Sequence, residues 1–234
     1  MTDVTRVTDV AGTVPGTDRR VLVVDVGGSH IKCLVPGETE ERKFDSGPDL
    51  GPVEMVAGVL EHTADWTYDV ISIGYPGPVR NGRPAVEPHN LAPGWVGFDY
   101  EQAFGTPVRM LNDAAMQALG SYHGGSMLFL GFGTGLGAAF VIQGNVQPLE
   151  LAHLPWRDGR TYEEWTGDAA LERDGEATWR ANVLEVIELF RAAFQPDYIV
   201  AGGGNVRLLK ELPEGVERGN NDNAFVGGYA LWAA

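Results

Sequence analysis

The chain has 234 residues and a formal net charge of −15, so it lacks the concentrated basic surface that nucleic acids and anionic membranes require. Hydrophobic residues make up 44% of it, enough to bury a sizeable core in one large α/β domain or in two lobes. The single cysteine, Cys33, excludes an internal disulfide and a cysteine-clustered zinc site, and it favours a reducing, cytoplasmic compartment.

Residues 1–18 carry acids and no apolar core of signal-peptide length, so we expect a loose tail there. No run reaches the roughly 18 apolar residues that a membrane span requires. We therefore expect neither a membrane nor a nucleic-acid partner.

A buried strand is predicted at 21–24, and Asp25 follows it directly. Gly27 and Gly28 supply the positive φ or the side-chain-free backbone of a hairpin turn, which leads into a second strand at 31–35. An acid beside bare backbone N–H groups is what a Mg²⁺-phosphate site needs. Turn geometry alone is the competing explanation for the two glycines.

The next segments predict a polar strand at 40–44, a helix at 52–64 and a buried strand at 69–73. Residues 74–95 are too rich in proline and glycine for regular structure, and their length favours a functional loop.

A short helix at 99–104, a strand at 108–111 and a helix at 114–122 are predicted next. Asp113 lies where that strand meets that helix. The structural alternative for this acid is a helix N-cap.

The opening pattern then recurs: a strand at 127–132, a glycine turn beginning at Gly133, a second strand and a tight hairpin at 143–145. This duplication indicates two related lobes, each offering one backbone loop to the same anion.

Helical regions are predicted at 161–173 and 176–194, followed by a buried strand at 197–201 that opens onto a run of three glycines. A helix begins at 206–211, and residues 225–232 form a last helix that packs back onto the protein.

The glycine turns do not fit the familiar nucleotide motifs. No G-x-x-x-x-G-K-[ST] is present, which excludes the usual P-loop. Residues 133–138 match G-x-G-x-x-A, but a strand follows them where a dinucleotide fold needs a helix.

Five motifs in order resemble the ROK (repressor, open reading frame, kinase) family of sugar kinases, and most closely its bacterial glucokinases, including the polyphosphate glucokinases. They are DVGGSHIK at 25–32, LNDAA at 111–115, GFGTGLGAAF at 131–140, ELAH at 150–153 and VAGGGN at 200–205. The resemblance implies an α/β actin-like ATPase (ribonuclease H-like) fold with two lobes and a central cleft. The N-terminal lobe would comprise 19–112 plus 222–234, and the C-terminal lobe 113–221.

The resemblance also implies a role for each matched residue. Asp113 would be the general base, and Asp25 would hold Mg²⁺ through water. The sugar would be bound by Asn90, Asn112, Glu150 and His153. The phosphates of the donor would be bound by Asp25, Gly27, Gly28, Ser29, Lys32, Gly133, Thr134 and Gly135, and its nucleoside by Gly202, Gly203 and Gly204. Without the resemblance, His153 would be interpreted as a structural histidine. Lys32 would be interpreted as a lysine that points to solvent.

The expected function is a hexose kinase that transfers a phosphoryl group from ATP, or from polyphosphate, to the 6-hydroxyl of glucose or a related sugar. The alternatives are a non-catalytic sugar-binding regulatory protein and a kinase of the same superfold that acts on a carboxylate. The resemblance also implies a homodimer. Two departures from the family matter: no cysteines follow His153, so we expect no structural zinc, and Ala152 replaces a glycine of the sugar motif.

Overall fold

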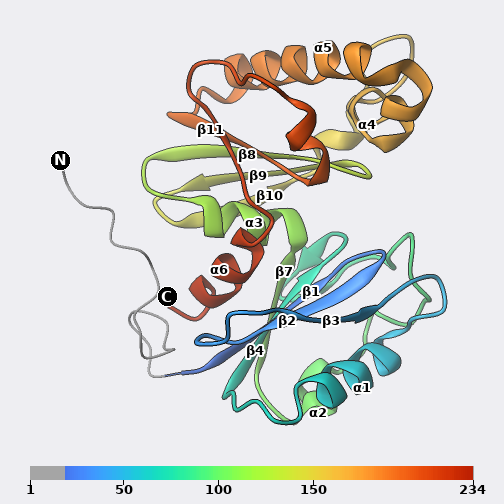
Figure 1. Ribbon diagram of the computed structural model, residues 1–234, viewed down its shortest axis with the longest axis vertical. Coiled ribbons are helices and arrows are strands. Elements are labelled where there is room, and N and C mark those ends of the chain that lie inside the picture. Colours follow the sequence, from blue (N-terminus) through green and yellow to red (C-terminus); the bar gives the residue numbers. More distant parts are fainter. Residues whose placement is uncertain (1–18, 234) are drawn as a thin grey trace. The chain divides into compact units, whose positions relative to one another are not determined.

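The computed structural model describes residues 19–233, which form helices and strands in two compact units (Figure 1). Of the described residues, the first unit contains 19–116 and 224–233, and the second is Gln117–Asn223. The predicted tail, residues 1–18, lies outside the described residues.

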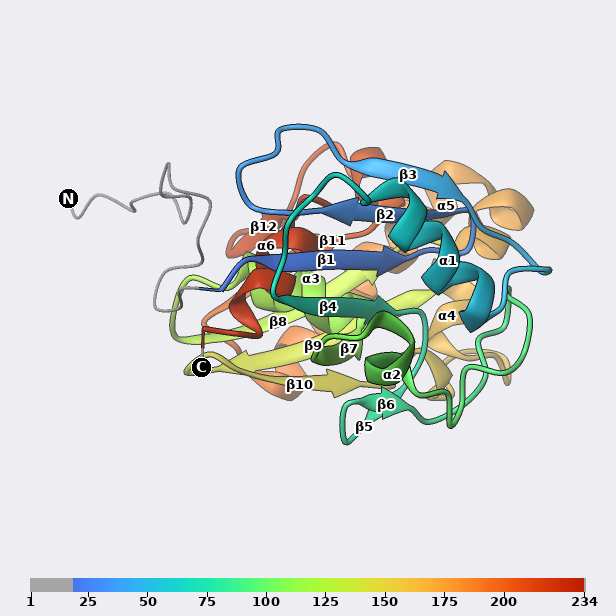
Figure 2. The same cartoon turned by 90° about the horizontal axis from the view of Figure 1, so that it is seen from below.

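The first unit contains a five-stranded sheet in the order β3-β2-β1-β4-β7 (Figure 2). Its strands are β1 (Val21–Val26), β2 (His30–Leu34), β3 (Arg42–Asp45), β4 (Val70–Tyr75) and β7 (Val108–Asn112). β1, β4 and β7 are parallel, whereas β2 and β3 pair antiparallel to their neighbours. The carboxyl ends of the three parallel strands therefore share one edge of the sheet, which is where open α/β sheets bind ligands.

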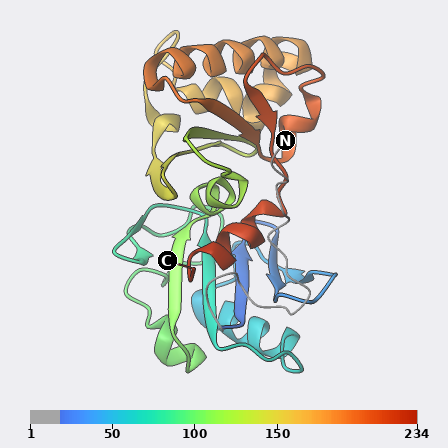
Figure 3. The same ribbon diagram turned by 90° about the vertical axis from the view of Figure 1, so that its left-hand side faces the viewer.

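Helices cover both faces of this sheet (Figure 3). Helices α1 (Pro52–His62) and α2 (Tyr100–Phe104) contribute Met55, Val59 and Tyr100 to one core, together with the side chains of Leu22 and Val24 on β1. Helix α6 (Asn223–Ala230) packs on the opposite face against the alternate residues of β1. Because side chains alternate along a strand, Asp25 lies on the α6 face.

A buried hydrogen-bonded chain anchors the C-terminal segment to the first sheet. The indole Nε1 of Trp232 donates to Ser72 Oγ at 3.0 Å, and that hydroxyl donates to the carbonyl of Gly228 at 2.6 Å. A Cβ added to Gly228 would lie 2.5 Å from Cγ1 and 2.6 Å from Cγ2 of Val23. Helix α6 can approach β1 this closely only with glycine at position 228.

We expect Gly228→Ala to lower the free energy of unfolding by about 1–3 kcal/mol, because overpacking outweighs the better helix propensity of alanine. In a Val23→Ala background, which removes both clashing methyl groups, the same change should cost less than about 0.5 kcal/mol. Urea denaturation of the four proteins in this double-mutant cycle measures the difference. Equal losses in both backgrounds would contradict the packing explanation.

The second unit repeats the strand order and directions of the first, with a sheet in the order β10-β9-β8-β11-β12. Its strands are β8 (Ser126–Phe132), β9 (Leu136–Ile142), β10 (Asn145–Leu149), β11 (Tyr198–Gly202) and β12 (Val216–Arg218). β8 and β11 are parallel, β11 and β12 are parallel, and β9 runs antiparallel to both of its neighbours. The duplication predicted from the two glycine turns is confirmed in the topology.

The long helix α5 (Asp168–Phe194) covers one face of the second sheet, where Trp179, Val183 and Ile187 join the core formed by β8, β9 and β11. A left-handed Gly175, with φ of 79°, interrupts its helical geometry close to the break expected between 173 and 176. Shorter helices complete the unit: α4 (Tyr162–Thr166), η1 (Leu151–His153) and η2 (Gly204–Leu208). Helix α3 (Asp113–Ser121) begins in the first unit and ends in the second.

Several local predictions differ from the structure. The loop expected to be irregular contains a small hairpin, β5 (Val79–Arg80) and β6 (Arg83–Pro84). Strand β12 was not predicted, and the helix expected at 206–211 is the short 3₁₀ segment η2. Among residues 19–233, no helix combines the length and the apolar character needed to span a membrane.

Candidate functional site

Asp25 lies at the carboxyl end of β1, opposite Gly74 on β4 and Lys32 on β2. A Cβ added to Gly74 would lie 3.2 Å from Oδ1 of Asp25 and 2.4 Å from the Met116 methyl, so a larger residue there would have to displace the Met116 side chain and crowd Asp25. Lys32 donates to Glu41 through an ion pair of 3.1 Å. Its charge is therefore shared, and Lys32 does not extend alone into solvent.

Burial raises the pKa of Asp25 to about 6; the positive charge of Lys32 opposes this shift, and the negative charge of Glu41 adds to it. The ionised carboxylate thus lacks sufficient counter-charge from the protein. A single such carboxylate fits Mg²⁺, which keeps several waters and takes its remaining ligands from donor phosphates. No group of three or more metal-ligating side chains occurs within residues 19–233.

The first glycine turn follows Asp25. Gly27 N–H donates to His30 O at 3.0 Å, and Ser46 Oγ donates to Gly27 O at 2.6 Å. A Cβ on Gly27 would lie 2.8 Å from His30 O, so Gly27 is required by the turn itself, although neither glycine has a positive φ. Gly28 is exposed and a Cβ there would make only ordinary contacts with Asn90, the nearest at 3.7 Å.

Asn112 and Asp113 occupy the same sheet edge as Asp25, because β1 and β7 both flank β4 in parallel. Asn112 Oδ1 accepts from Ala115 N at 3.1 Å, and its Nδ2 donates to Gly77 O at 3.2 Å. Asn112 therefore caps helix α3. Capping was the structural alternative considered for Asp113. Asp113 Oδ1 accepts from the adjacent Ala114 N at 2.7 Å, and its side chain is partly exposed.

The loop that carries Asn90 is organised by a carboxylate. Glu87 accepts from the backbone N–H groups of three consecutive residues, Gly94, Trp95 and Val96, at 3.0–3.2 Å. The Trp95 side chain is fully buried in the first core. The loop is thus fixed at both ends of the Asn90 segment, next to the first glycine turn.

The second glycine turn is held by the elements that follow it in the same unit. Gly133 N–H donates to Gly135 O at 3.1 Å, and Asp168 N–H at the start of α5 donates to Gly133 O at 3.0 Å. Glu163 Oε2 on α4 accepts from Leu136 N at 3.2 Å and fills the space beside Gly135. Thr134 is left exposed at the tip of the turn.

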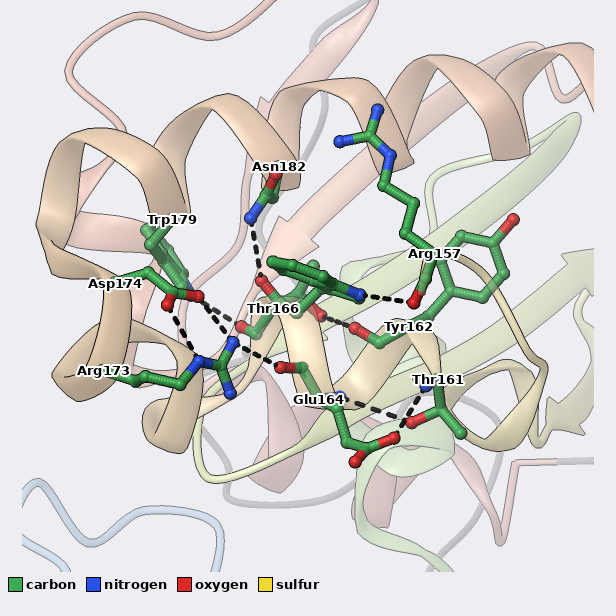
Figure 4. Close-up of polar contacts among 10 residues, drawn as sticks. Arg157, Thr161, Tyr162, Glu164, Thr166, Arg173, Asp174, Trp179 and Asn182 are labelled. Atoms are coloured by element: carbon green, nitrogen blue, oxygen red, sulfur yellow. Dashed lines mark hydrogen bonds and ion pairs between the residues drawn. The ribbon is translucent and has the colours of Figure 1, made fainter. Parts of the chain in front are cut away.

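Helix α4, which carries Glu163, has a dense set of its own polar contacts (Figure 4). Thr161 and Glu164 form a capping box at its start. The indole Nε1 of Trp179 donates to Thr166 O at 2.7 Å, and Arg173 donates to Glu164 O at 3.0 Å. These bonds fix α4, and with it Glu163, against the second glycine turn.

The third glycine run contains two residues that packing requires and one that it does not. A Cβ on Gly202 would lie 2.6 Å from the Phe129 ring, and one on Gly203, whose φ is 82°, would lie 2.3 Å from Phe132 O. Gly204 is exposed and has open space in that direction. A Cβ on Gly133 would lie 3.8 Å from Gly204 N, so the second and third turns are neighbours.

Glu150 is the N-cap residue of η1 and His153 is its last residue, with His153 Nε2 3.6 Å from Glu150 Oε2. Both side chains are more than half exposed. Ala152 between them is buried in the core of the second unit. The methyl group that distinguishes it from glycine therefore packs inward, away from the surface that carries the two polar side chains.

Three residues were missed by the sequence analysis: Glu87, which holds the Asn90 loop, and Glu163 and Asp168, which hold the second glycine turn. The T-x-x-E pattern at 161–164 is a readable signal for the start of α4. The contacts of Glu163 and Asp168 join residues 27 to 37 positions apart, which no local pattern encodes.

Comparison with known proteins finds a matching family and solved structures of the same fold. The sequence profile of the ROK family matches residues 21–148. A polyphosphate glucokinase of Mycobacterium tuberculosis is 28% identical over 212 residues, which cover 80% of this chain and 78% of that one.

Two solved structures share the fold. The inorganic polyphosphate/ATP-glucomannokinase of Arthrobacter sp. strain KM superposes with a TM-score of 0.78 at 22% identity, covering 92% of this chain and 98% of that chain. A ROK family glucokinase of Streptomyces griseus, solved with glucose and AMPPNP, gives a TM-score of 0.75 at 17% identity. The match covers 91% of this chain and 98% of that chain. The actin-like ATPase fold expected from the sequence is thereby confirmed.

Proposed function

The chain belongs to the ROK family, and on that premise we propose that it is a hexose kinase. It transfers the terminal phosphoryl group of ATP or of polyphosphate to the 6-hydroxyl of glucose or a related hexose. The observation that carries the proposal is the shared sheet edge of Asp25 and Asp113, with the exposed Gly28 turn directly after Asp25. A cation-binding acid, an anion-binding turn and a base are the parts that phosphoryl transfer needs.

Asp113 is the proposed general base. Its carboxylate accepts the proton of the hexose hydroxyl as the oxygen attacks phosphorus, which contributes about 10²–10⁴-fold in rate. The bond from Ala114 N holds one carboxylate oxygen, and this fixes the orientation of the group. Asn112 keeps the remaining hydrogen-bonding capacity of its amide for a neighbouring hydroxyl, since one lone pair and one N–H are engaged by the backbone.

Asp25 is proposed to hold Mg²⁺ through water. When bound, the cation would neutralise charge on the donor phosphates. The residues Ser29 and Lys32 lie beside Asp25 on the turn and on the adjacent strand, where they can contact the same phosphates.

Backbone N–H groups of the Gly27–Gly28 turn and of the Gly133–Gly135 turn are proposed to bind the donor phosphates, and Gly204 to lie against the donor beyond them. Relatives named for polyphosphate and for ATP support testing both donors. Asn90, Glu150 and His153 are proposed to bind the remaining sugar hydroxyls.

The test is a transfer assay with glucose, mannose and other hexoses, Mg²⁺, and either ATP or polyphosphate, read by ³¹P NMR. We expect a hexose 6-phosphate from at least one combination. Hexose binding without turnover with either donor would favour the regulatory alternative. Phosphorylation of a carboxylate substrate instead would place the chain among other kinases of the superfold.

The third glycine run offers a matched pair of variants. Gly204→Ala should leave the melting temperature within about 1 °C, because its Cβ meets nothing, yet raise the donor KM severalfold by filling space that the donor occupies. Gly203→Ala should destabilise the protein by more than about 2 kcal/mol, because of its positive φ and the clash with Phe132 O. An unchanged donor KM in Gly204→Ala would exclude Gly204 from the donor site.

A further inference from the structure

Asp168, the first residue of α5, contacts both glycine turns of the second unit. Its backbone N–H donates to Gly133 O at 3.0 Å, and its Oδ1 accepts from Asn205 Nδ2 at 2.5 Å. Asn205 follows Gly204 in η2 and is only 8% exposed. One residue therefore links the turn after β8 to the turn after β11.

The two turns touch each other directly as well. A Cβ on Gly133 would lie 3.8 Å from Gly204 N, and Gly203 packs against Phe132 O. On its far side, η2 is held by Arg218, which donates to the carbonyls of Val206 and Leu209. Within the described residues, a side-chain hydrogen bond between Asp168 and Asn205 thus joins η2 to the start of α5.

Packing alone does not require a carboxylate–amide bond here, because an apolar residue in place of the buried Asn205 would fill the same space without a polar group to satisfy. The charge-assisted hydrogen bond is directional, so it fixes the start of α5 and η2 in one position relative to each other. A carboxylate is also electrostatically favoured in the first turn of a helix.

We propose that Asp168 and Asn205 form a positioning pair for the phosphoryl donor. The pair fixes the second and third glycine turns at the separation at which both bind one phosphate chain, the chemical group that ATP and polyphosphate share. This inference rests on the proposed kinase function. Neither side chain is a catalytic residue, because each acts through the backbone of the adjoining turn.

The test reverses the polarity of the bond. Asn205→Asp places two carboxylates at hydrogen-bonding distance, and we expect it to raise the donor KM at least tenfold while the hexose KM stays within twofold. Asp168→Asn keeps an acceptor oxygen and should change the donor KM by less than about threefold. The double variant Asp168→Asn/Asn205→Asp exchanges donor and acceptor and should bring the donor KM back to within about threefold of wild type.

Each variant is also measured for melting temperature and for calorimetric affinity toward tripolyphosphate without sugar. A purely structural pair would lower the melting temperature and leave the split between the two KM values unchanged, which overturns the proposal. Where Asn205→Asp does not fold, Asp168→Ala removes the bond without repulsion and should show the same selective loss.

Wild-type protein that binds tripolyphosphate without turnover would refute the kinase function, and the binding arm would still decide the role of the pair. Failure of the wild type to bind tripolyphosphate at all would overturn both proposals. A donor KM that stays raised in the double variant would overturn the positioning pair alone.

Discussion

Replacing Asp113 with Asn is expected to lower kcat by about 10²–10⁴-fold while the affinity for hexose changes little. An amide retains the oxygen that accepts from Ala114 N, so the local structure of α3 is kept. It cannot accept the proton of the sugar hydroxyl. Steady-state kinetics with hexose 6-phosphate detection, combined with calorimetric titration of hexose, measure both quantities.

Asp99→Asn is the matched control for this change. Asp99 is an exposed acid at the start of helix α2, where its Oδ1 accepts from Gln102 N at 3.0 Å. Its replacement by Asn removes the same charge as Asp113→Asn does. We expect its kcat to equal that of wild type. An Asp113→Asn variant with wild-type kcat would assign Asp113 a local structural role and remove it from the mechanism.

Asp25→Asn is expected to stabilise the protein at pH 7–8 and to abolish transfer. Burial raises the pKa of Asp25 from its usual value of 3.8 to about 6, so folding favours the protonated form. Stability of the wild type should therefore fall as pH rises from about 4 to 6, and the full cost is present above pH 6. The expected cost is roughly 1–3 kcal/mol, where the upper value is the full shift and solvent screening of the partly accessible carboxylate gives the lower values.

Thermal denaturation in EDTA should show a melting temperature about 3–10 °C higher for Asp25→Asn at pH 7.5, and no difference below pH 4. Asp49→Asn, at an exposed acid in the loop after β3, should match wild type at every pH. Because protons compete with the cation, transfer by the wild type should need more Mg²⁺ as pH falls below 6. Lower stability of Asp25→Asn at pH 7.5 would show that the ionised Asp25 carboxylate stabilises the folded protein.

The two opening strands and their glycine turns could be predicted because fully buried strands appear as uninterrupted apolar runs and a hairpin turn needs glycine. The same reasoning found the repeat around Gly133, and the shared strand order confirms it. The place of Asp25 at a strand end made it a candidate, whereas the role of Asp113 as a base is implied by the family resemblance. That they share one sheet edge followed only from the parallel pairing of β1, β4 and β7.

The remaining features depend on contacts between segments far apart in the sequence. β12 has three residues and forms only by pairing with β11. Glu163 and Asp168 reach glycine turns that precede them by roughly 30 residues, and neither lies in a motif. The resemblance assigns Gly202 and Gly203 to the donor nucleoside, yet packing against Phe129 and Phe132 already requires glycine at both positions. Gly204 is therefore the glycine whose substitution can test donor binding.

The central claim is tested most directly by a crystal structure of the protein with a hexose and a non-hydrolysable donor. We predict an Asp113 carboxylate oxygen within about 3.2 Å of the hexose 6-oxygen, with the donor phosphates in contact with the Gly28 turn at the same sheet edge. A hexose whose 6-hydroxyl lies beyond reach of Asp113, or a donor whose phosphates do not touch the Gly28 turn, would contradict the account.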